Sequence, residues 1–378
     1  MFNRRHFLGS MAASLMQAAP RKPNVLFMVA DGWRGQTLAS AGDTGLTAPS
    51  LALLAQEGMY FSRAYSANPM RTPARAAILT GKFPHSCKVP QNDVPLPANE
   101  TSIADQLKQA GYATADFKSA DLAIEFIRQS KANPFYAYVS LEPEQFPRSL
   151  YDPTALTLRQ NVPYAYEGRA RERYAEYYAR CSAIDEIVGA LLAALRQNEI
   201  AEDTIVIFTS GHGDMLGSHG LELDSEPYEE SAHIPLLLRY PRALNAGAVN
   251  DSLISNVDYM PTLLSLCGVE VPAGVQGQDL ARLLLTGSGK RPEALYCEGR
   301  LTQPGEWRML VRGYDKLVVN TKLEPTHFFN LATDPFESSN QATDKFQLRR
   351  IDELTAVLKN WMRRTGDRVP YPAIRKRA

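Results

Sequence analysis

The chain has 378 residues, of which 44% are hydrophobic and 22% are charged, and this composition is that of a globular protein, not of a disordered one. Its length allows a large buried core, as one large domain or as one domain with a smaller companion. The 41 basic and 41 acidic side chains give a formal net charge of 0, so no global field favours nucleic acid or acidic lipid, and any anion binding must be local.

Residues 1–20 read as a segment that does not belong to the fold. A twin-arginine pair, Arg4-Arg5, precedes a short apolar run from Phe7 to Met16, which is too short to span a bilayer. This pattern is typical of a twin-arginine export signal, with a plain basic extension as the alternative. We therefore expect a periplasmic or secreted protein with no stable membrane insertion once the signal is removed.

From residue 23 to about residue 285, strand patterns alternate with helix patterns. Strands are predicted at 23–30, 112–117, 135–141, 204–209 and 234–240, and helices at 49–58, 101–110, 123–130, 171–198 and 258–266. A serine cap is expected at the start of the first helix, and the segment 142–170 reads as a loop. The alternation predicts an α/β domain over residues 21–290, with a mostly parallel central sheet flanked by helices.

Beyond Arg291 the pattern changes to short strands followed by a helix. Antiparallel strands are predicted at 295–298, 307–312 and 316–319, and a final helix at 348–363. These elements predict a small C-terminal α+β subdomain over residues 291–378. The four cysteines, Cys87, Cys181, Cys267 and Cys297, are widely spaced; disulfide pairing stays open, and buried free thiols are at least as plausible.

The stretch from Ser66 to His85 reads S-A-N-P-M-R-T-P-A-R-A-A-I-L-T-G-K-F-P-H. Two positions that precede proline favour extended backbone, and an apolar run closed by Thr80-Gly81 follows. The pattern predicts a loop that feeds the N-terminus of a helix, with Gly81 near its C-cap. Such a loop can hold a reactive group or an anion against free N–H groups.

Residues 72–82, T-P-A-R-A-A-I-L-T-G-K, resemble the signature of the sulfatase family, within the alkaline phosphatase superfamily. Further matching landmarks lie at 23–31, 111–114, 210–220, 228–231, 258–263 and 331–337. The resemblance implies an alkaline-phosphatase-like fold and a sulfuric ester hydrolase that uses formylglycine, made from a Cys or Ser, and a calcium ion.

Several positions depart from the family pattern, and all of them fall in the implied site. Arg71 stands where the family has Cys or Ser, so formylglycine cannot form there, and a guanidinium has no lone pair with which to attack an ester. The carboxylate pairs that would hold calcium read Asp31-Gly32 and Gly211-His212, with one ligand missing from each. The resemblance also implies that two histidines are lost, at Ala120 and Glu144, and that Asp224 replaces a lysine.

The resemblance assigns roles to the residues that remain. Arg71 marks the catalytic nucleophile position, while Arg75, Lys118 and His212 would act in catalysis and substrate binding. Asp31 and His212 would be the remnant of the metal site. Three of these residues also have a structural interpretation. Asp31 would accept hydrogen bonds in a loop, Arg75 would brace its helix, and Lys118 would be an ordinary solvated lysine. Calcium, expected for the family, is not expected to bind here.

We expect the Arg71 guanidinium to fill the vacated cation space and to form a bidentate pair with Asp31. A separation beyond roughly 6 Å would rule this out.

Three functions remain open from the sequence. The first is a sulfatase-like protein with an anion-binding cleft and weak or absent hydrolysis. The second is an active hydrolase of sulfate, phosphate or phosphonate esters that uses water activated by His212. The third is a pseudoenzyme that binds an anionic glycan or a partner protein. In each case the expected ligand is a small anionic ester or a sulfated glycan, and nucleic acid is not expected.

Overall fold

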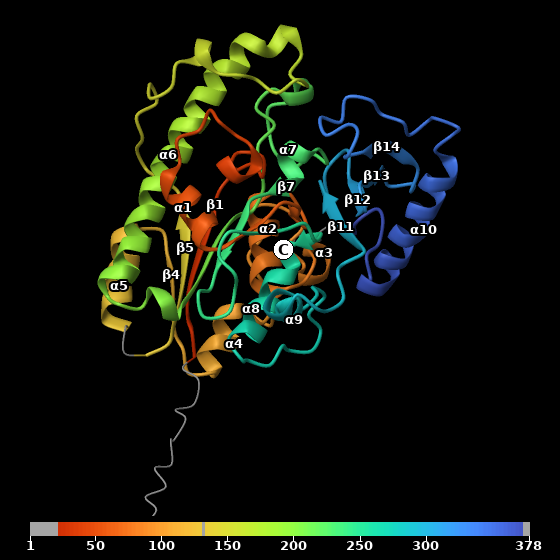
Figure 1. Cartoon of the computed structure of the whole chain (residues 1–378). Coiled ribbons are helices and arrows are strands. Elements are labelled where there is room, and N and C mark those ends of the chain that lie inside the picture. The colour runs from red at the N-terminus through yellow and green to blue at the C-terminus, as the bar shows by residue number, and fades with distance from the viewer. Residues whose placement is uncertain (1–21, 131–132, 373–378) are drawn as a thin grey trace, which may run out of the picture.

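A seven-stranded sheet forms the centre of the molecule (Figure 1). The computed structural model describes residues 22–130 and 133–372, so the predicted export signal lies outside the described residues. The strand order is β4-β5-β1-β6-β8-β2-β9. The strands are β1 (Asn24–Ala30), β2 (Met59–Phe61), β4 (Ala113–Phe117), β5 (Phe135–Leu141), β6 (Thr204–Ser210), β8 (Leu236–Arg239) and β9 (Ala248–Asn250).

The sheet is mostly parallel, as predicted. Strands β4, β5, β1 and β6 run parallel to one another, and β2 and β9 run parallel to each other. Only β8 pairs antiparallel with both neighbours, β6 and β2, among the seven strands. Because parallel strands all end at the same edge, the residues that follow β1, β5 and β6 meet there.

Helices cover both faces of the sheet (Figure 1). One face carries α1 (Pro49–Glu57), α5 (Ala120–Ser130) and α6 (Glu167–Gln197), and the other carries α2 (Arg71–Thr80), α4 (Ile103–Gln109), α8 (Tyr259–Leu266) and α9 (Ala281–Thr286). Successive side chains of β1 point to opposite faces of the sheet. Leu26 and Met28 pack on the face that α6 covers, and Val25 and Phe27 pack on the face that α8 covers. A strand buried on both faces reads as the continuous apolar run seen in the sequence.

Two predictions for this domain were wrong in detail. The strand expected at 234–240 is split at Pro235 into β7 (His233–Ile234) and β8, because proline has no N–H for the ladder. The short β7 pairs with β3 (Ala64–Tyr65), which also pairs with β10 (Ile254–Ser255) in a separate sheet. Helix α6 starts at Glu167, inside the segment expected to be a loop.

The serine cap predicted for α1 is also wrong. The N-cap residue is Ala48, which makes no side-chain cap. The carboxylate of Asp185, from α6, accepts the backbone N–H groups of Ser50 at 2.9 Å and Leu51 at 2.7 Å. A capping group can therefore come from a helix that is distant in the sequence, which local pattern reading does not reveal.

A four-stranded antiparallel sheet and a helix follow the main sheet, to its right in Figure 1. They comprise β11 (Ala294–Gly299), β12 (Trp307–Arg312), β13 (Asp315–Val319), β14 (Pro325–Asn330) and α10 (Leu348–Thr365). The division at residue 290 stays a prediction. All four cysteines are buried and unpaired.

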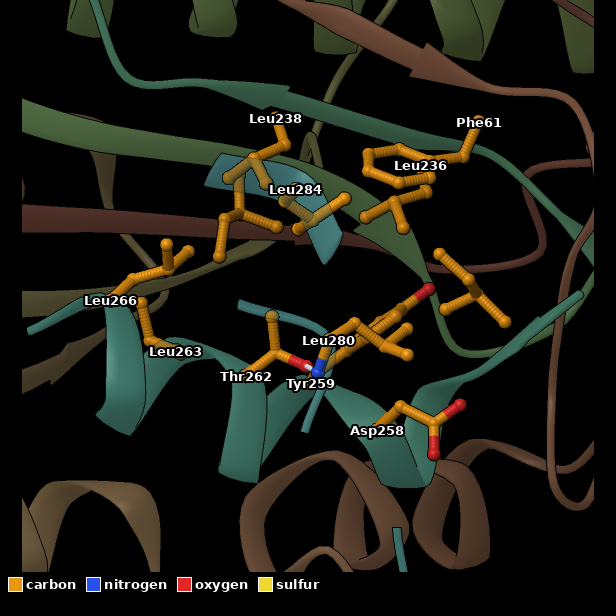
Figure 2. A pocket seen from close by; sticks show the side chains of 12 residues that line it. Phe61, Leu236, Leu238, Asp258, Tyr259, Thr262, Leu263, Leu266, Leu280 and Leu284 are labelled. Carbon is orange, nitrogen blue, oxygen red and sulfur yellow. Dashed lines mark hydrogen bonds between the residues drawn. The ribbon is translucent and has the colours of Figure 1, made fainter. Parts of the chain in front are cut away.

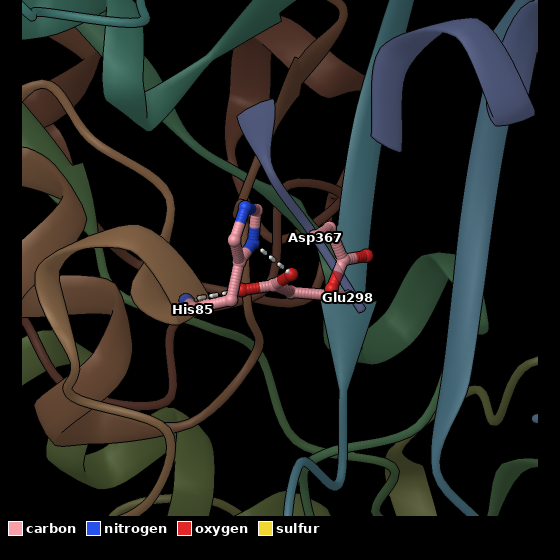
Figure 3. A group of neighbouring side chains, drawn as sticks. All are labelled: His85, Glu298 and Asp367. Atoms are coloured by element: carbon pink, nitrogen blue, oxygen red, sulfur yellow. Dashed lines mark hydrogen bonds and ion pairs between the residues drawn. The ribbon is translucent and has the colours of Figure 1, made fainter. Parts of the chain in front are cut away.

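A buried ionic cluster joins this C-terminal part to the main domain; Figure 3 draws its members His85, Glu298 and Asp367. His85, on the short helix α3 (Pro84–Cys87), lies 2.6 Å from Glu298 of β11 through its Nδ1 atom. Arg308 of β12 donates to Asp367, which follows α10, at 2.6 and 2.9 Å. We call these four residues the clasp. Charged groups buried together in this way hold their elements in register, at a desolvation cost that only complete pairing offsets.

The clasp predicts a pH dependence of stability that can be assigned to His85. Burial opposes the imidazolium form, but the charge and hydrogen bond of Glu298 outweigh it and raise the pKa of His85 above 6.5. The contribution of His85 to the free energy of unfolding is therefore complete below its unfolded-state pKa and is lost as the pH rises through its folded-state pKa. The free energy of unfolding lost in His85→Gln, from urea titrations, should be larger at pH 6 than at pH 9.

His327→Gln is the matched control for this prediction. Burial lowers the pKa of His327, so its contribution has the opposite sign and is lost as the pH falls. A loss in His85→Gln that is the same at both pH values would show that folding does not raise the pKa of His85.

Candidate functional site

Four segments converge at the carboxyl edge of the central sheet. Asp31 follows β1, Glu142 follows β5, and Gly211-His212 follow β6. Arg71 is the first residue of α2, whose C-cap is Gly81 in the left-handed conformation, as predicted. The parallel pairing of β1 with β5 and β6 places Ala30 beside Leu141 and Ser210. Side chains that lie far apart in the sequence therefore meet at one place.

The predicted contact between Arg71 and Asp31 is present. The Arg71 Nη2 atom lies 2.6 Å and the Nε atom 3.2 Å from Asp31 Oδ2. Both donors converge on one oxygen, so the pair is not the two-oxygen bidentate arrangement that we expected; the other oxygen, Oδ1, faces His212. Arg71 Nη1 also lies 3.4 Å from Glu142 Oε1. A cation in the first turn of a helix opposes the helix dipole, and these two carboxylates offset that cost.

His212 is buried and is held between two carboxylates. Its Nε2 atom lies 3.2 Å from Asp31 Oδ1 and 3.4 Å from Asp224 Oδ2, while Nδ1 lies 3.0 Å from the carbonyl oxygen of Gly213. Burial alone would lower the pKa of His212, but the hydrogen bond that it donates to Asp31 and the charge of Asp224 raise it to about 9. Since both ring nitrogens face acceptors, His212 is an imidazolium that donates from both.

The same contacts act on Asp31. Burial would raise the pKa of this carboxyl, but His212 and Arg71 together hold it well below its ordinary value. Asp31 is therefore a carboxylate with both oxygens engaged by cations of the protein itself.

Asp224 occupies the position where the resemblance implies a lysine. Its carboxylate faces His212, and burial raises its pKa. The sign of the charge at this position is thus opposite to that of a sulfate-binding lysine. We call the linked side chains of Arg71, Asp31, His212 and Asp224 the ion-pair chain.

Arg75 and Lys118 do not touch the ion-pair chain. Arg75 lies one turn beyond Arg71 on α2, pairs with Asp116 of β4 and lies over the Tyr138 ring, 5.0 Å from its centroid. Lys118 is exposed and pairs with no carboxylate in the described part of the chain. The structure therefore places these two cations outside the ion-pair chain.

The space beside Gly32 is filled by residues that the sequence did not single out. A Cβ atom on Gly32 would lie 3.0 Å from Arg180 Nη2 and 3.0 Å from Asp214 Oδ2. Arg180 comes from α6, and its guanidinium lies 3.7 Å from the Asp214 carboxylate. Asp214 follows Gly-His-Gly and could have been found from that motif, whereas Arg180 lies in a long helix with no local signal.

The residues present do not fit the calcium ion of the family. Gly32 and Gly211 offer no side-chain oxygen, and both oxygens of Asp31 are bound by Arg71 and His212. A calcium ion needs 6–8 oxygen ligands, several of them charged. Among residues 22–130 and 133–372, the groups with three close ligand atoms are His85–Glu298–Asp367 (Figure 3) and His219–Glu230–Glu337, both elsewhere.

A small cavity of about 30 Å³ lies away from these residues, between α8, α9 and the sheet (Figure 2). Its walls are mainly leucine, isoleucine and aromatic side chains. The Asp258 carboxylate beside it accepts the backbone N–H groups of Ser255 and Gln278 at 2.8 and 2.7 Å, so it braces a loop. An apolar space of this size is a packing defect and not a ligand site.

Comparison with known proteins gives matches over most of the chain. The family model described as Sulfatase matches residues 23–122 and 114–269, and the model described as N-sulphoglucosamine sulphohydrolase, C-terminal, matches residues 217–364. The chain is 28% identical to the ulvan-active sulfatase of Formosa agariphila, covering 93% of this chain and 83% of that one. It is 25% identical to an N-acetylglucosamine-6-O-sulfatase of Bacteroides thetaiotaomicron, covering 93% and 88%.

Solved structures match over similar lengths. A Bacteroides fragilis protein assigned as a sulfatase superposes with a TM-score of 0.84 at 26% identity, covering 93% of this chain and 98% of that one. The phosphonate monoester hydrolase of Agrobacterium radiobacter superposes with a TM-score of 0.80 at 21% identity, covering 91% and 96%, which is a likeness of fold alone.

Proposed function

The chain belongs to the sulfatase family and has its alkaline-phosphatase-like fold, and from this premise we propose that it binds an anionic ester or sulfated glycan without the family's formylglycine- and calcium-dependent hydrolysis. The observation that carries this proposal is the Arg71 guanidinium bound to Asp31 at 2.6 Å. The residue at the nucleophile position thus binds the Asp31 carboxylate, which a calcium ion would need as a ligand. One substitution removes the attacking group and blocks the metal.

The alternative in which His212 activates water is less well supported. A general base must be unprotonated at the working pH and must face the water. His212 has a pKa of about 9, and both its ring nitrogens are directed at acceptors of the protein. Near neutral pH it holds its proton, so it stabilises carboxylates and does not accept protons.

The ligand class is inferred from the exposed cations of α2 and of the segment after β4, and from the relatives. Arg71 is half-exposed, Arg75 is partly exposed, and Lys118 carries an exposed ammonium group. Arg71 belongs to the ion-pair chain and keeps an exposed side chain, while Arg75 and Lys118 lie outside that chain, so all three cations can offer N–H donors to an anion. The relatives are named for activity on ulvan and on N-acetylglucosamine 6-O-sulfate, so a sulfated glycan is the ligand class that we favour.

The location of the protein is also inferred. No helix in the described ranges combines the length and apolar character needed to cross a membrane. Together with the predicted twin-arginine signal, which lies outside those ranges, this supports a periplasmic or secreted protein.

The proposal is tested by measuring hydrolysis and binding on the same protein. With 4-methylumbelliferyl sulfate, we expect no turnover above the heat-inactivated sample, with or without added calcium. With glucosamine 6-sulfate, calorimetry should detect binding that glucosamine does not reproduce, and Arg75→Gln with Lys118→Gln should weaken it about 10-fold, the size expected for losing charge-assisted hydrogen bonds.

Arg349→Gln, on the exposed surface of α10, is the matched control and should bind like the wild type. Turnover that a chelator abolishes would overturn the proposal, and so would equal binding of the sulfated and unsulfated sugars.

A further inference from the structure

A cavity of about 200 Å³ adjoins the ion-pair chain on the α6 side. Arg173, Tyr177 and Arg180 of α6 line one wall, and Asp214 and Glu222 line another. The three α6 residues are spaced i, i+4 and i+7, so one face of the helix is directed at the cavity. We call this cavity the α6 pocket. It reaches the centre of the site because Arg180 and Asp214 also flank Gly32.

The two arginines in the pocket are only loosely held by carboxylates. The Arg180 Nη2 atom lies 3.7 Å from Asp214, and Arg173 Nη1 lies 3.5 Å from Glu222. Charge-assisted hydrogen bonds to a carboxylate are usually about 2.7–2.9 Å long. Both guanidinium groups therefore keep N–H donors for another oxyanion. The side chain of Arg173 is 35% exposed and that of Arg180 is 28% exposed.

The charges around the pocket favour an anion. Glu176 and Glu222 are also contacted from outside the pocket, by Arg148 at 3.3 Å and by Arg169 at 2.6 Å. The side chains that line the pocket, two arginines (173 and 180) and three carboxylates (176, 214 and 222), carry a net charge of −1, and the two arginines outside it (148 and 169) bring the whole cluster to +1. Because Arg148 and Arg169 neutralise Glu176 and Glu222 from outside, Arg173 and Arg180 face the pocket with only Asp214 to balance them. In a partly enclosed space these two guanidinium groups attract an anion more strongly than they would in open water.

The remaining walls are apolar and aromatic. Phe146 and the Tyr177 ring line the pocket, and Leu223 at its edge is 72% exposed. Ligand sites combine such apolar surface with a few convergent polar groups. Ring faces with guanidinium donors at one end suit a saccharide that carries an oxyanion.

We propose that the α6 pocket is a second binding subsite, in which Arg173 and Arg180 hold the carboxylate or sulfate of a saccharide whose neighbouring residue reaches Arg71. This inference rests on the proposed function and adds the position of a second anionic group on the ligand. Arg180 would then join the pocket to the centre, since its guanidinium reaches the space beside Gly32.

Calorimetric titration with four tetrasaccharides tests the subsite. Hyaluronan tetrasaccharide carries carboxylates only, a κ-carrageenan tetrasaccharide carries sulfates only, and the neutral chitin and agarose tetrasaccharides carry neither. We expect at least one charged probe to bind, and its affinity to fall about 10-fold or more in Arg173→Gln/Arg180→Gln. The charged probe that binds more tightly identifies the oxyanion.

Arg173→Gln alone should give a smaller loss, and it guards against misfolding of the double variant because Arg173 is the more exposed residue. Arg349→Gln should change nothing. The subsite inference is overturned if neither charged probe binds, if a neutral probe binds equally well, or if Arg173→Gln and the folded double variant both keep wild-type affinity. Loss of affinity in Arg75→Gln but not in the α6 variants would leave the proposed function standing and remove only the subsite.

Discussion

Replacing Arg308 with alanine is expected to lower the free energy of unfolding by about 3–5 kcal/mol, the range for breaking a buried ion pair by removing one partner. The Arg308 side chain is fully buried. It binds both oxygens of Asp367 and lies 2.9 Å from Glu306. Without Arg308, the carboxylates of Asp367 and Glu306 stay buried beside Glu298, and too few cations remain nearby to offset the cost of burying them. Urea unfolding at neutral pH measures the effect.

Two further variants calibrate this prediction. Arg308→Lys keeps the charge but cannot reach both Asp367 oxygens in one plane, so its loss should be intermediate. Arg349→Ala, at a side chain that is 89% exposed, should change stability by no more than about 0.5 kcal/mol. A loss below about 1 kcal/mol in Arg308→Ala would show that the buried pair of Arg308 and Asp367 does not stabilise the C-terminal part.

The second large effect is a gain of calcium binding in a reconstructed site. The variant Gly32→Asp/Arg71→Ser/Gly211→Asp/Arg180→Ala should bind one calcium ion, with a dissociation constant on the order of 10⁻⁴–10⁻³ M, as in weak extracellular sites. It restores two carboxylates and removes the two guanidinium groups that fill the cation space. Gly32 has φ of +65°, which aspartate tolerates better than most side chains. Calorimetry with calcium chloride provides the measurement.

The matched control keeps Arg180. In Gly32→Asp/Arg71→Ser/Gly211→Asp, the aspartate introduced at position 32 meets Arg180 and Asp214, each 3.0 Å from the place of its Cβ atom. We therefore expect weaker calcium binding in the triple variant than in the quadruple one. Equal calcium affinity in the triple and quadruple variants would mean that Arg180 does not hinder calcium binding.

The sequence was sufficient for the main elements because their signals are local. The buried strands β1, β5 and β6 read as apolar runs, and α2 reads from its prolines and Gly81. The two-residue strands β3, β7 and β10 carry no such signal, since their pairing depends on partners far along the chain. The cap of α1 was missed for the same reason: its acceptor, Asp185, lies 135 residues from Ser50 and 134 from Leu51.

The site divides in a similar way. Asp31, Arg71 and His212 were predicted from motif positions, and the structure brings them into contact. The contact of Glu142 with Arg71 was not predicted, because the two residues meet only once the strand ends are aligned. The sequence placed Asp224 in the site but did not show that its carboxylate faces His212. Lys118 shows the opposite case: it fits the motif but lies apart from the centre. Motif spacing identifies which residues reach an edge of the sheet, but not which of them touch.

The most direct test of the central claim is a crystal structure determined in the presence of calcium and a sulfated sugar. The account predicts that Arg71 Nη2 stays within hydrogen-bonding distance of Asp31 Oδ2, with no anomalous signal for calcium between Asp31 and His212. A calcium ion bound to Asp31, with the Arg71 side chain displaced, would contradict it.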